Sequence, residues 1–144
     1  MDAEYLEHFL PGKSEFFIGN IAKIRDLCAA RGIKFFIITQ QARSLSINPR
    51  GLTYKEEVNL IKQKLNHQKG TKNDIYFLVH DRMMDDLQKW ARENGALLID
   101  GMGPIDAHRE YLASWVHLNP EGNRILAEAI ARDILLQLRK AGRN

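Results

Sequence analysis

A histidine that directly precedes a strongly signalled helix is the first candidate for chemistry in this chain. His117 lies in the tract Ser114–Asn123, where Asn119 and Pro120 form a typical helix start. Asparagine caps free N–H groups, and proline suits the first helical position, so the preceding loop should be held in place. A histidine on a loop of this kind is suited to act as a general base. The alternative is a loop histidine that is hydrogen-bonded near a helix cap.

The same tract resembles the last conserved block of the SGNH (GDSL-type) esterase and lipase superfamily. In that block an Asp-x-x-His tract precedes a Leu-x-Pro-x-Gly helix start. His117 matches the catalytic histidine of the family, and Leu118–Gly122 follow it as they do there, whereas Ser114 stands at the position of the triad aspartate. The resemblance implies an ester or acyl substrate, no cofactor, and His117 as general base for a serine nucleophile.

Two other tracts of the family do not occur in this sequence. The nucleophile of the family sits in a Gly-Asp-Ser tract, and its oxyanion-hole asparagine sits in a Gly-x-Asn-Asp tract. A serine at position 114 can hydrogen-bond an imidazole, but it cannot stabilise an imidazolium as a carboxylate does. We therefore expect the chain to be inactive alone. One hypothesis is an esterase-like hydrolase portion completed by missing sequence or by a partner, and the other is a noncatalytic pseudoenzyme that serves as an interaction or structural domain.

The elements that must position His117 follow a repeated pattern of helix, glycine and buried strand. A first helix, capped by Ser14, should end at Gly32 and lead into a strand over 33–39. A later long helix ends at Gly95 and leads into a strand over 96–100. Apolar runs without polar alternation are typical of strands buried on both faces of a parallel sheet.

Helix signals also occur between and after these strands. Thr53 and Glu56 predict a capping box for a second helix that ends near His67, and a polar turn over 69–73 separates it from the third. The last helix is expected from about 120 to 139. Its apolar stripe should pack on the sheet, and consists of Leu126, Ile130, Ile134 and Leu138.

These elements predict a single α/β domain over residues 1–144. The repeated pattern predicts parallel strands joined by right-handed crossovers. The resemblance to the SGNH family implies a three-layer α/β/α, flavodoxin-like arrangement, of which this chain resembles the C-terminal part. Two strands are few for such a sheet, so the sheet should be incomplete within one chain. An uncovered strand edge must be paired or covered. We therefore expect a homo-oligomer, most simply a dimer, or a missing N-terminal portion.

Polar residues at the carboxyl ends of both predicted strands are the candidates for substrate contacts. Thr39 and Gln40 follow the first strand and Asp100 follows the second, where open α/β sheets bind ligands. Asp100 is also a candidate for the carboxylate that Ser114 does not supply. The alternatives are a polar turn after the first strand, and a loop hydrogen bond or solvation for Asp100. Ser44 has no glycine-flanked elbow and is not a predicted nucleophile.

Composition excludes several other classes of function. The 144 residues are 44% hydrophobic and 27% charged, with no apolar run near the roughly 18 residues of a membrane span. The net charge of +3 comes from scattered basic residues, so no nucleic-acid partner is expected. The histidines lack metal-ligand spacing, and no metal site is predicted. A single cysteine, Cys28, and the lack of a secretory signal in residues 1–12 favour a cytoplasmic location.

Overall fold

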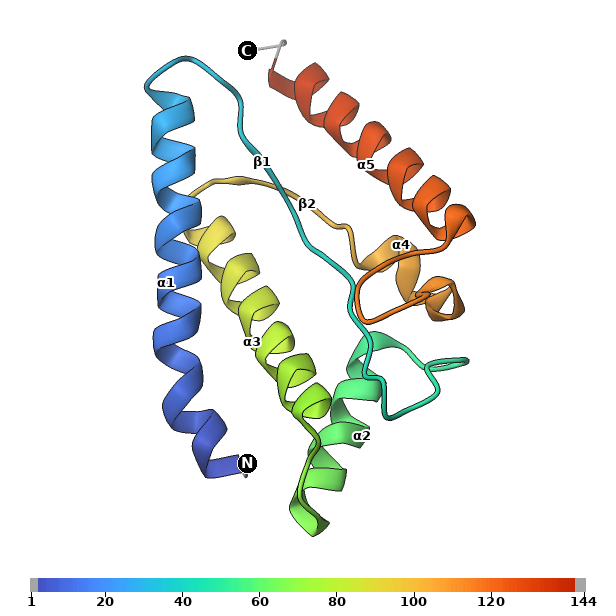
Figure 1. Cartoon of the computed structure of the whole chain (residues 1–144). Helices are drawn as coiled ribbons and strands as arrows, with labels where there is room; N and C mark the ends of the chain where they lie inside the picture. Colours follow the sequence, from blue (N-terminus) through green and yellow to red (C-terminus); the bar gives the residue numbers. More distant parts are fainter. Residues whose placement is uncertain (1–2, 142–144) are drawn as a thin grey trace.

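The chain forms a mostly helical α/β structure in which a two-strand parallel sheet is packed among helices (Figure 1). This computed structural model describes residues 3–141, with side-chain burial for residues 12–140. In chain order, the elements are α1 (Ala3–Ala29), β1 (Phe36–Ile38), α2 (Tyr54–His67), α3 (Lys72–Glu93), β2 (Leu97–Ile99), α4 (Gly103–Asp106), the 3₁₀ helix η1 (Arg109–Tyr111) and α5 (Pro120–Ala141).

The two strands lie where the sequence predicts them and pair in parallel. Phe36 lies opposite Leu97, and Ile38 lies opposite Ile99. The regular pairing covers three residues in each strand, which is shorter than the predicted ranges of 33–39 and 96–100. The α/β class with parallel strands is therefore confirmed. In the described part of the chain only β2 pairs with β1, and the other edge of β1 has no strand beside it.

Helix ends largely follow the local signals in the sequence. Gly32 and Gly95 adopt positive φ angles of 67° and 59°, the left-handed conformation that closes α1 and α3 before each strand. The capping box at the start of α2 is present as predicted. A second capping box, in which the Thr71 side chain accepts from Asp74 N–H, starts α3. From its composition, that segment was expected to be only a polar turn.

The predicted start of the first helix is wrong. α1 begins at Ala3, so Ser14 lies in the helix interior instead of capping it. Its side chain is only 3% exposed, and its hydroxyl donates a 2.6 Å hydrogen bond to the carboxylate of Asp86 in α3. A serine is tolerated inside a helix when its hydroxyl finds a partner. Here that partner comes from the neighbouring helix, which a local capping rule does not consider.

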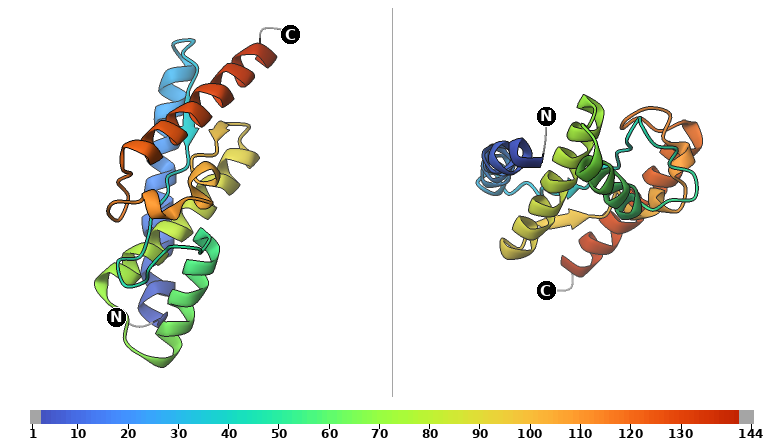
Figure 2. Two further views of the ribbon diagram at one scale, coloured as in Figure 1. Left: turned by 90° about the vertical axis from the view of Figure 1, so that its right-hand side faces the viewer. Right: turned by 90° about the horizontal axis from the view of Figure 1, so that it is seen from below.

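Helices lie on both faces of the sheet. α1 and α3 run side by side, and the views of Figure 2 place α5 on the other side of the strands. Ile37 and Leu98 pack in the cluster between the sheet and the α1–α3 pair. Ile38, the next residue of β1, shares a cavity with Leu126 and Ile130 of α5, because successive strand side chains point to opposite faces.

A second cluster joins α2 to α3 beneath the loop that follows β1. Its fully buried members include Val58 and Ile61 of α2 and Phe77 of α3. This cluster supports the loop after β1, through Ala42, and also the loop that carries His117, through Trp115 and Val116. Within residues 3–141, no helix combines the length and the apolar character needed to cross a membrane.

The predicted apolar stripe of α5 is only partly covered. Leu126, Ile130 and Ile134 are half-buried, whereas Leu138 is exposed, as are Leu135 and Leu136 beside it. The uncovered leucines lie toward the carboxyl end of α5. Toward this end the sheet is still in contact with α5, because the side-chain amide of Gln137 donates to the Leu98 carbonyl of β2 at 3.3 Å.

Candidate functional site

His117 lies on a tight loop between η1 and α5 that is closed by backbone hydrogen bonds. Leu112 and Leu118 form an isolated antiparallel bridge, and the N–H groups of Ala113 and Ser114 both donate to the His117 carbonyl, at 2.8 and 3.3 Å. These bonds hold the segment between them as a hairpin. The loop therefore presents the His117 side chain at a defined place.

The start of α5 anchors the carboxyl end of this loop, as the sequence predicts. Asn119 accepts a 2.9 Å hydrogen bond from Gly122 N–H on its side chain, which is the geometry of an N-cap. Its own N–H donates to the Tyr111 carbonyl at 2.8 Å. A Cβ on Gly122 would crowd Tyr111 and Leu118, so glycine permits this close approach. The loop and the helix are thus packed as one unit.

Ser114 is hydrogen-bonded to the His117 ring. Its hydroxyl oxygen lies 2.7 Å from Nδ1 of His117 and also accepts a 3.3 Å bond from the His117 backbone N–H. The serine thus contacts the ring nitrogen that an orienting carboxylate contacts in a Ser-His-Asp triad. Nε2 is left for a ligand or a reacting group. The ring is exposed, and Ser114 is half-buried.

A cavity of about 460 Å³ lies beside His117, between the end of β1 and the first turns of α5. Val116 and Leu118 line it from the loop, and the residues that follow β1 line it from the sheet. Its volume falls in the range of about 300–1,000 Å³ that small-molecule sites occupy. None of the described residues that line this cavity is acidic. The structure brings Thr39 and Gln40, two predicted substrate contacts, to the same cavity as His117.

The polar groups at the end of β1 differ in their availability. Gln40 is exposed, whereas Thr39 is 2% exposed and its hydroxyl bonds Gly101 N–H at 3.0 Å. Gln41, 4% exposed, donates from its side-chain amide to the Met102 carbonyl at 2.7 Å. Gln40 is therefore the side chain of this segment that is placed to contact a ligand, while its two neighbours hold the loops together.

Asp100 is not brought to His117. Its carboxylate accepts 2.9 Å bonds from the N–H groups of Met102 and Gly103, which is the loop role that sequence analysis gave as the alternative. It lines a separate cavity of about 700 Å³ between α4 and α5, together with the acidic residues Glu128 and Asp133. Asp100 thus does not take the place of the missing triad carboxylate.

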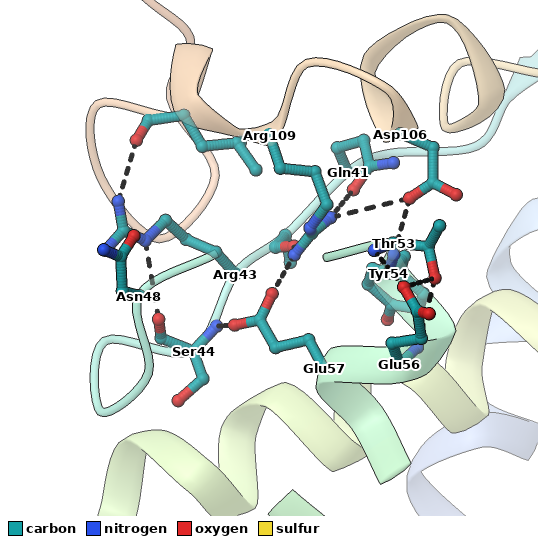
Figure 3. Close-up of polar contacts among 12 residues, drawn as sticks. Gln41, Arg43, Ser44, Asn48, Thr53, Tyr54, Glu56, Glu57, Asp106 and Arg109 are labelled. Atoms are coloured by element: carbon teal, nitrogen blue, oxygen red, sulfur yellow. Dashed lines mark hydrogen bonds and ion pairs between the residues drawn. The ribbon is translucent and has the colours of Figure 1, made fainter. Parts of the chain in front are cut away.

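A buried ion pair, which sequence analysis missed, fixes the loop after β1. The guanidinium of Arg109, 1% exposed, pairs with the carboxylate of Glu57, 0% exposed, and donates to the Gln41 side chain at 2.5 Å and the Ala42 carbonyl at 2.9 Å (Figure 3). Glu57 also accepts the Ser44 N–H at 2.5 Å. Burial raises the pKa of the Glu57 carboxyl above its ordinary value, and Arg109 opposes that rise. The pair therefore helps to hold Gln41, which lines the cavity beside His117.

Ser44, which is buried, and Ser46, which is exposed, belong to a second hydrogen-bond network around Asp74. Both hydroxyls hydrogen-bond the carboxylate of Asp74, which also pairs with Lys64 at 2.9 Å. Although burial alone would raise it, hydrogen bonds from Ser46, Lys64 and Thr71 bring the pKa of Asp74 well below its ordinary range. With its side chain fully buried, Ser44 is closed to a substrate.

An aromatic cluster supports the His117 loop from the α2–α3 side. Trp115 packs edge-on against His80 at 6.2 Å between ring centroids, and the Tyr54 hydroxyl lies 2.9 Å from His80 Nδ1. Burial lowers the pKa of His80 to about 4. His80 therefore stays neutral near pH 7. Its role is to support the loop, whereas His117 is the histidine that lines the cavity.

Neither a metal centre nor a known relative identifies the site. Residues 3–141 contain no group of three or more His, Cys, Asp or Glu side chains placed to hold a metal ion. No protein-family model matches this chain, and comparisons with curated proteins and with solved structures found no similar protein. An assignment of function must therefore be argued from the residues around His117.

Proposed function

We propose that this chain is an SGNH-type esterase-like hydrolase portion in which His117 is the general base for an ester or acyl substrate. The observation that carries the proposal is the 2.7 Å hydrogen bond between Ser114 Oγ and His117 Nδ1, beside a cavity of about 460 Å³. An oriented imidazole next to a ligand-sized cavity is what general-base catalysis requires. In this proposal the helices on both faces of the sheet are the outer layers of a three-layer, flavodoxin-like fold.

The nucleophile has to come from outside the described residues. Ser44 and Ser46 are tied to Asp74, and the sequence has no Gly-Asp-Ser tract. The open edge of β1 is the place where further strands would join the sheet, either from sequence that precedes this chain or from another chain. A parallel strand added there would end beside the His117 cavity, since the carboxyl ends of parallel strands meet at one edge. The chain alone is therefore inactive in this proposal.

A noncatalytic domain is the second candidate, and the side chain at position 114 favours it. An uncharged serine cannot stabilise the imidazolium that forms when His117 accepts a proton. In a serine protease with a Ser-His-Asp triad, turnover falls roughly 10⁴-fold when the aspartate is replaced by asparagine. In that case the scaffold would serve in interaction or structure, with β1 and α5 as the surface for a second copy or another partner. A cytoplasmic location, with Cys28 as a free thiol, fits both candidates.

Covalent labelling with a serine-directed fluorophosphonate tests the two candidates. We would label the chain alone and the chain in the complex that co-purifies with it from its native source. The hydrolase proposal expects no labelling of the chain alone and labelling of one serine in the complex, lost in His117→Ala and kept in His67→Ala, a change at an exposed position in α2. A complex that does not label, with an intact fold by circular dichroism, would establish the noncatalytic candidate instead.

A further inference from the structure

We propose that the cavity beside His117 binds a small aliphatic carboxylic acid, with the carboxylate held by the Nε2–H group of His117. The ligand class is an alkyl chain with one carboxylate, as in a short fatty acid. The proposal uses the same cavity as the proposed function. It requires no nucleophile, so it holds equally for a noncatalytic domain.

The position of one proton carries the argument. Ser114 Oγ accepts the His117 backbone N–H at 3.3 Å and lies 2.7 Å from Nδ1. A hydroxyl has one hydrogen to donate. Either the hydroxyl or Nδ1–H can be the donor of the 2.7 Å bond, and in this proposal the hydroxyl is the donor. The neutral ring then carries its own proton on Nε2.

A carboxylate at position 114 would impose the opposite tautomer. An ionised aspartate only accepts hydrogen bonds, so it requires Nδ1–H and leaves the lone pair on Nε2. With Ser114 as a donor, Nε2 becomes a donor instead. His117 at rest is then a group that binds an anion, and it becomes a base only after its tautomer changes.

The polar side chains that line the cavity are compatible with a carboxylate. None of the described lining residues is acidic, and the exposed Gln40 offers a further amide donor at the rim. The neighbouring cavity between α4 and α5 differs, because three carboxylates, of Asp100, Glu128 and Asp133, line it together with Arg132 and His108. The cavity beside His117 has no carboxylate in its described lining to oppose a ligand with a negative charge.

The rest of the cavity wall suits an alkyl chain. Ile38 of β1, 41% exposed, faces the half-buried Leu126 and Ile130 of α5 across the cavity. Burying an alkyl chain between these residues would remove apolar surface from water on both sides. Each buried CH₂ group should strengthen binding about three- to fourfold. A ligand whose carboxylate lies at His117 and whose alkyl chain lies along α5 would match both the polar and the apolar part of the cavity.

Nuclear magnetic resonance of the full chain tests the proton position and the ligand together. At pH 8.5, long-range ¹H–¹⁵N spectra should show the proton of His117 on Nε2. In the Ser114→Ala variant that preference should weaken, because Nδ1 loses its donor. A wild-type ring with its proton on Nδ1 would overturn the proposal.

Titration with sodium octanoate, 1-octanol and octylammonium then identifies the ligand class. Octanoate should shift the His117, Ile38 and Leu126 signals and bind about tenfold more tightly than octylammonium, a difference of about 1.4 kcal/mol. His117→Phe keeps a ring in place. It should weaken the binding of octanoate about tenfold and leave the affinity for 1-octanol unchanged. His67→Phe, a matched change on the exposed surface of α2, should alter neither ligand.

Two results would reject the carboxylate site. One is that millimolar octanoate leaves the His117 signals unmoved, and the other is that octanoate binds His117→Phe as tightly as it binds the wild type. Neither result bears on the fluorophosphonate test, which reads a serine in the native complex. The failure of this inference and the failure of the proposed function are therefore distinguishable.

Discussion

Removing the carboxylate of Glu57 should destabilise the fold more than any exposed substitution. Glu57→Ala removes the nearest anion of the Arg109 guanidinium, which is 1% exposed, and leaves it two neutral oxygens and the more distant carboxylate of Asp106 at 4.0 Å. It also leaves the Ser44 N–H without the carboxylate that accepts it at 2.5 Å. Removing one member of a buried ion pair costs about 3–5 kcal/mol, and an unsatisfied buried N–H costs about 1–3 kcal/mol.

These two costs overlap, because water that enters the space would solvate both groups. We therefore expect a loss of about 4 kcal/mol in the free energy of unfolding, out of the roughly 5–15 kcal/mol of a typical domain. Glu57→Gln keeps one acceptor and should lose less, about 2 kcal/mol. Urea denaturation followed by circular dichroism measures both. Glu93→Ala, which removes an exposed partner of Lys89, is the control and should leave the midpoint nearly unchanged.

The double variant Glu57→Leu with Arg109→Met distinguishes two causes of the lost stability, an unpaired buried charge and lost packing. Replacing both charges by apolar side chains of similar size removes the buried guanidinium that has lost its nearest carboxylate, so at least about 2 kcal/mol should return relative to Glu57→Ala. If Glu57→Ala costs less than about 1 kcal/mol, or if the double variant is less stable than Glu57→Ala, then the pair does not hold the loop after β1 as argued.

Three further predictions concern pH, backbone packing and association. Because burial lowers the pKa of His80 to about 4 from an ordinary value near 6.5, the unfolded chain binds more protons between these values. Stability should be full above pH 6.5 and fall by up to about 3 kcal/mol as pH drops to 4, and His80→Gln should flatten that slope in urea midpoints measured against pH. Gly101→Ala would place a Cβ against the Thr39 carbonyl and should cost about 2 kcal/mol or more in thermal unfolding, whereas unchanged stability would disprove a close approach there. The open edge of β1 should be covered by self-association, so sedimentation of a folded monomer at tens of micromolar, above the micromolar range of weak interfaces, would contradict it.

Local features of the structure could be read from the sequence because residues a few positions apart produce them. The glycines at 32 and 95 end helices whatever packs around them, since only the left-handed conformation closes the last turn there. The capping box of Thr53 and the N-cap of Asn119 use partners three residues away. The hydrogen bond from Ser114 to His117 spans the same distance, and the sequence therefore indicated that such a bond could form.

The same local reasoning failed where the partner comes from another element. Ser14 has the side chain of a helix cap, but Asp86, 72 residues away, satisfies its hydroxyl and lets α1 continue through it. Asp100 has the position of a catalytic carboxylate at a strand end, but the N–H groups of its own loop occupy it. A residue type states which bonds a side chain can make, and packing decides which of them it makes.

By itself, the sequence indicated the α/β class, the two strands, most of the helix ends and the candidate role of His117, because hydrophobic runs, caps and a short motif are local. Only the tertiary structure decided that Arg109 pairs with Glu57, 52 residues away, and that His117 shares a cavity with Gln40. Many charged residues in the chain could have paired, and no local pattern distinguishes the two that become buried. Burial selects them, since a buried charge is stable only with its partner, and burial is a property of the assembled fold.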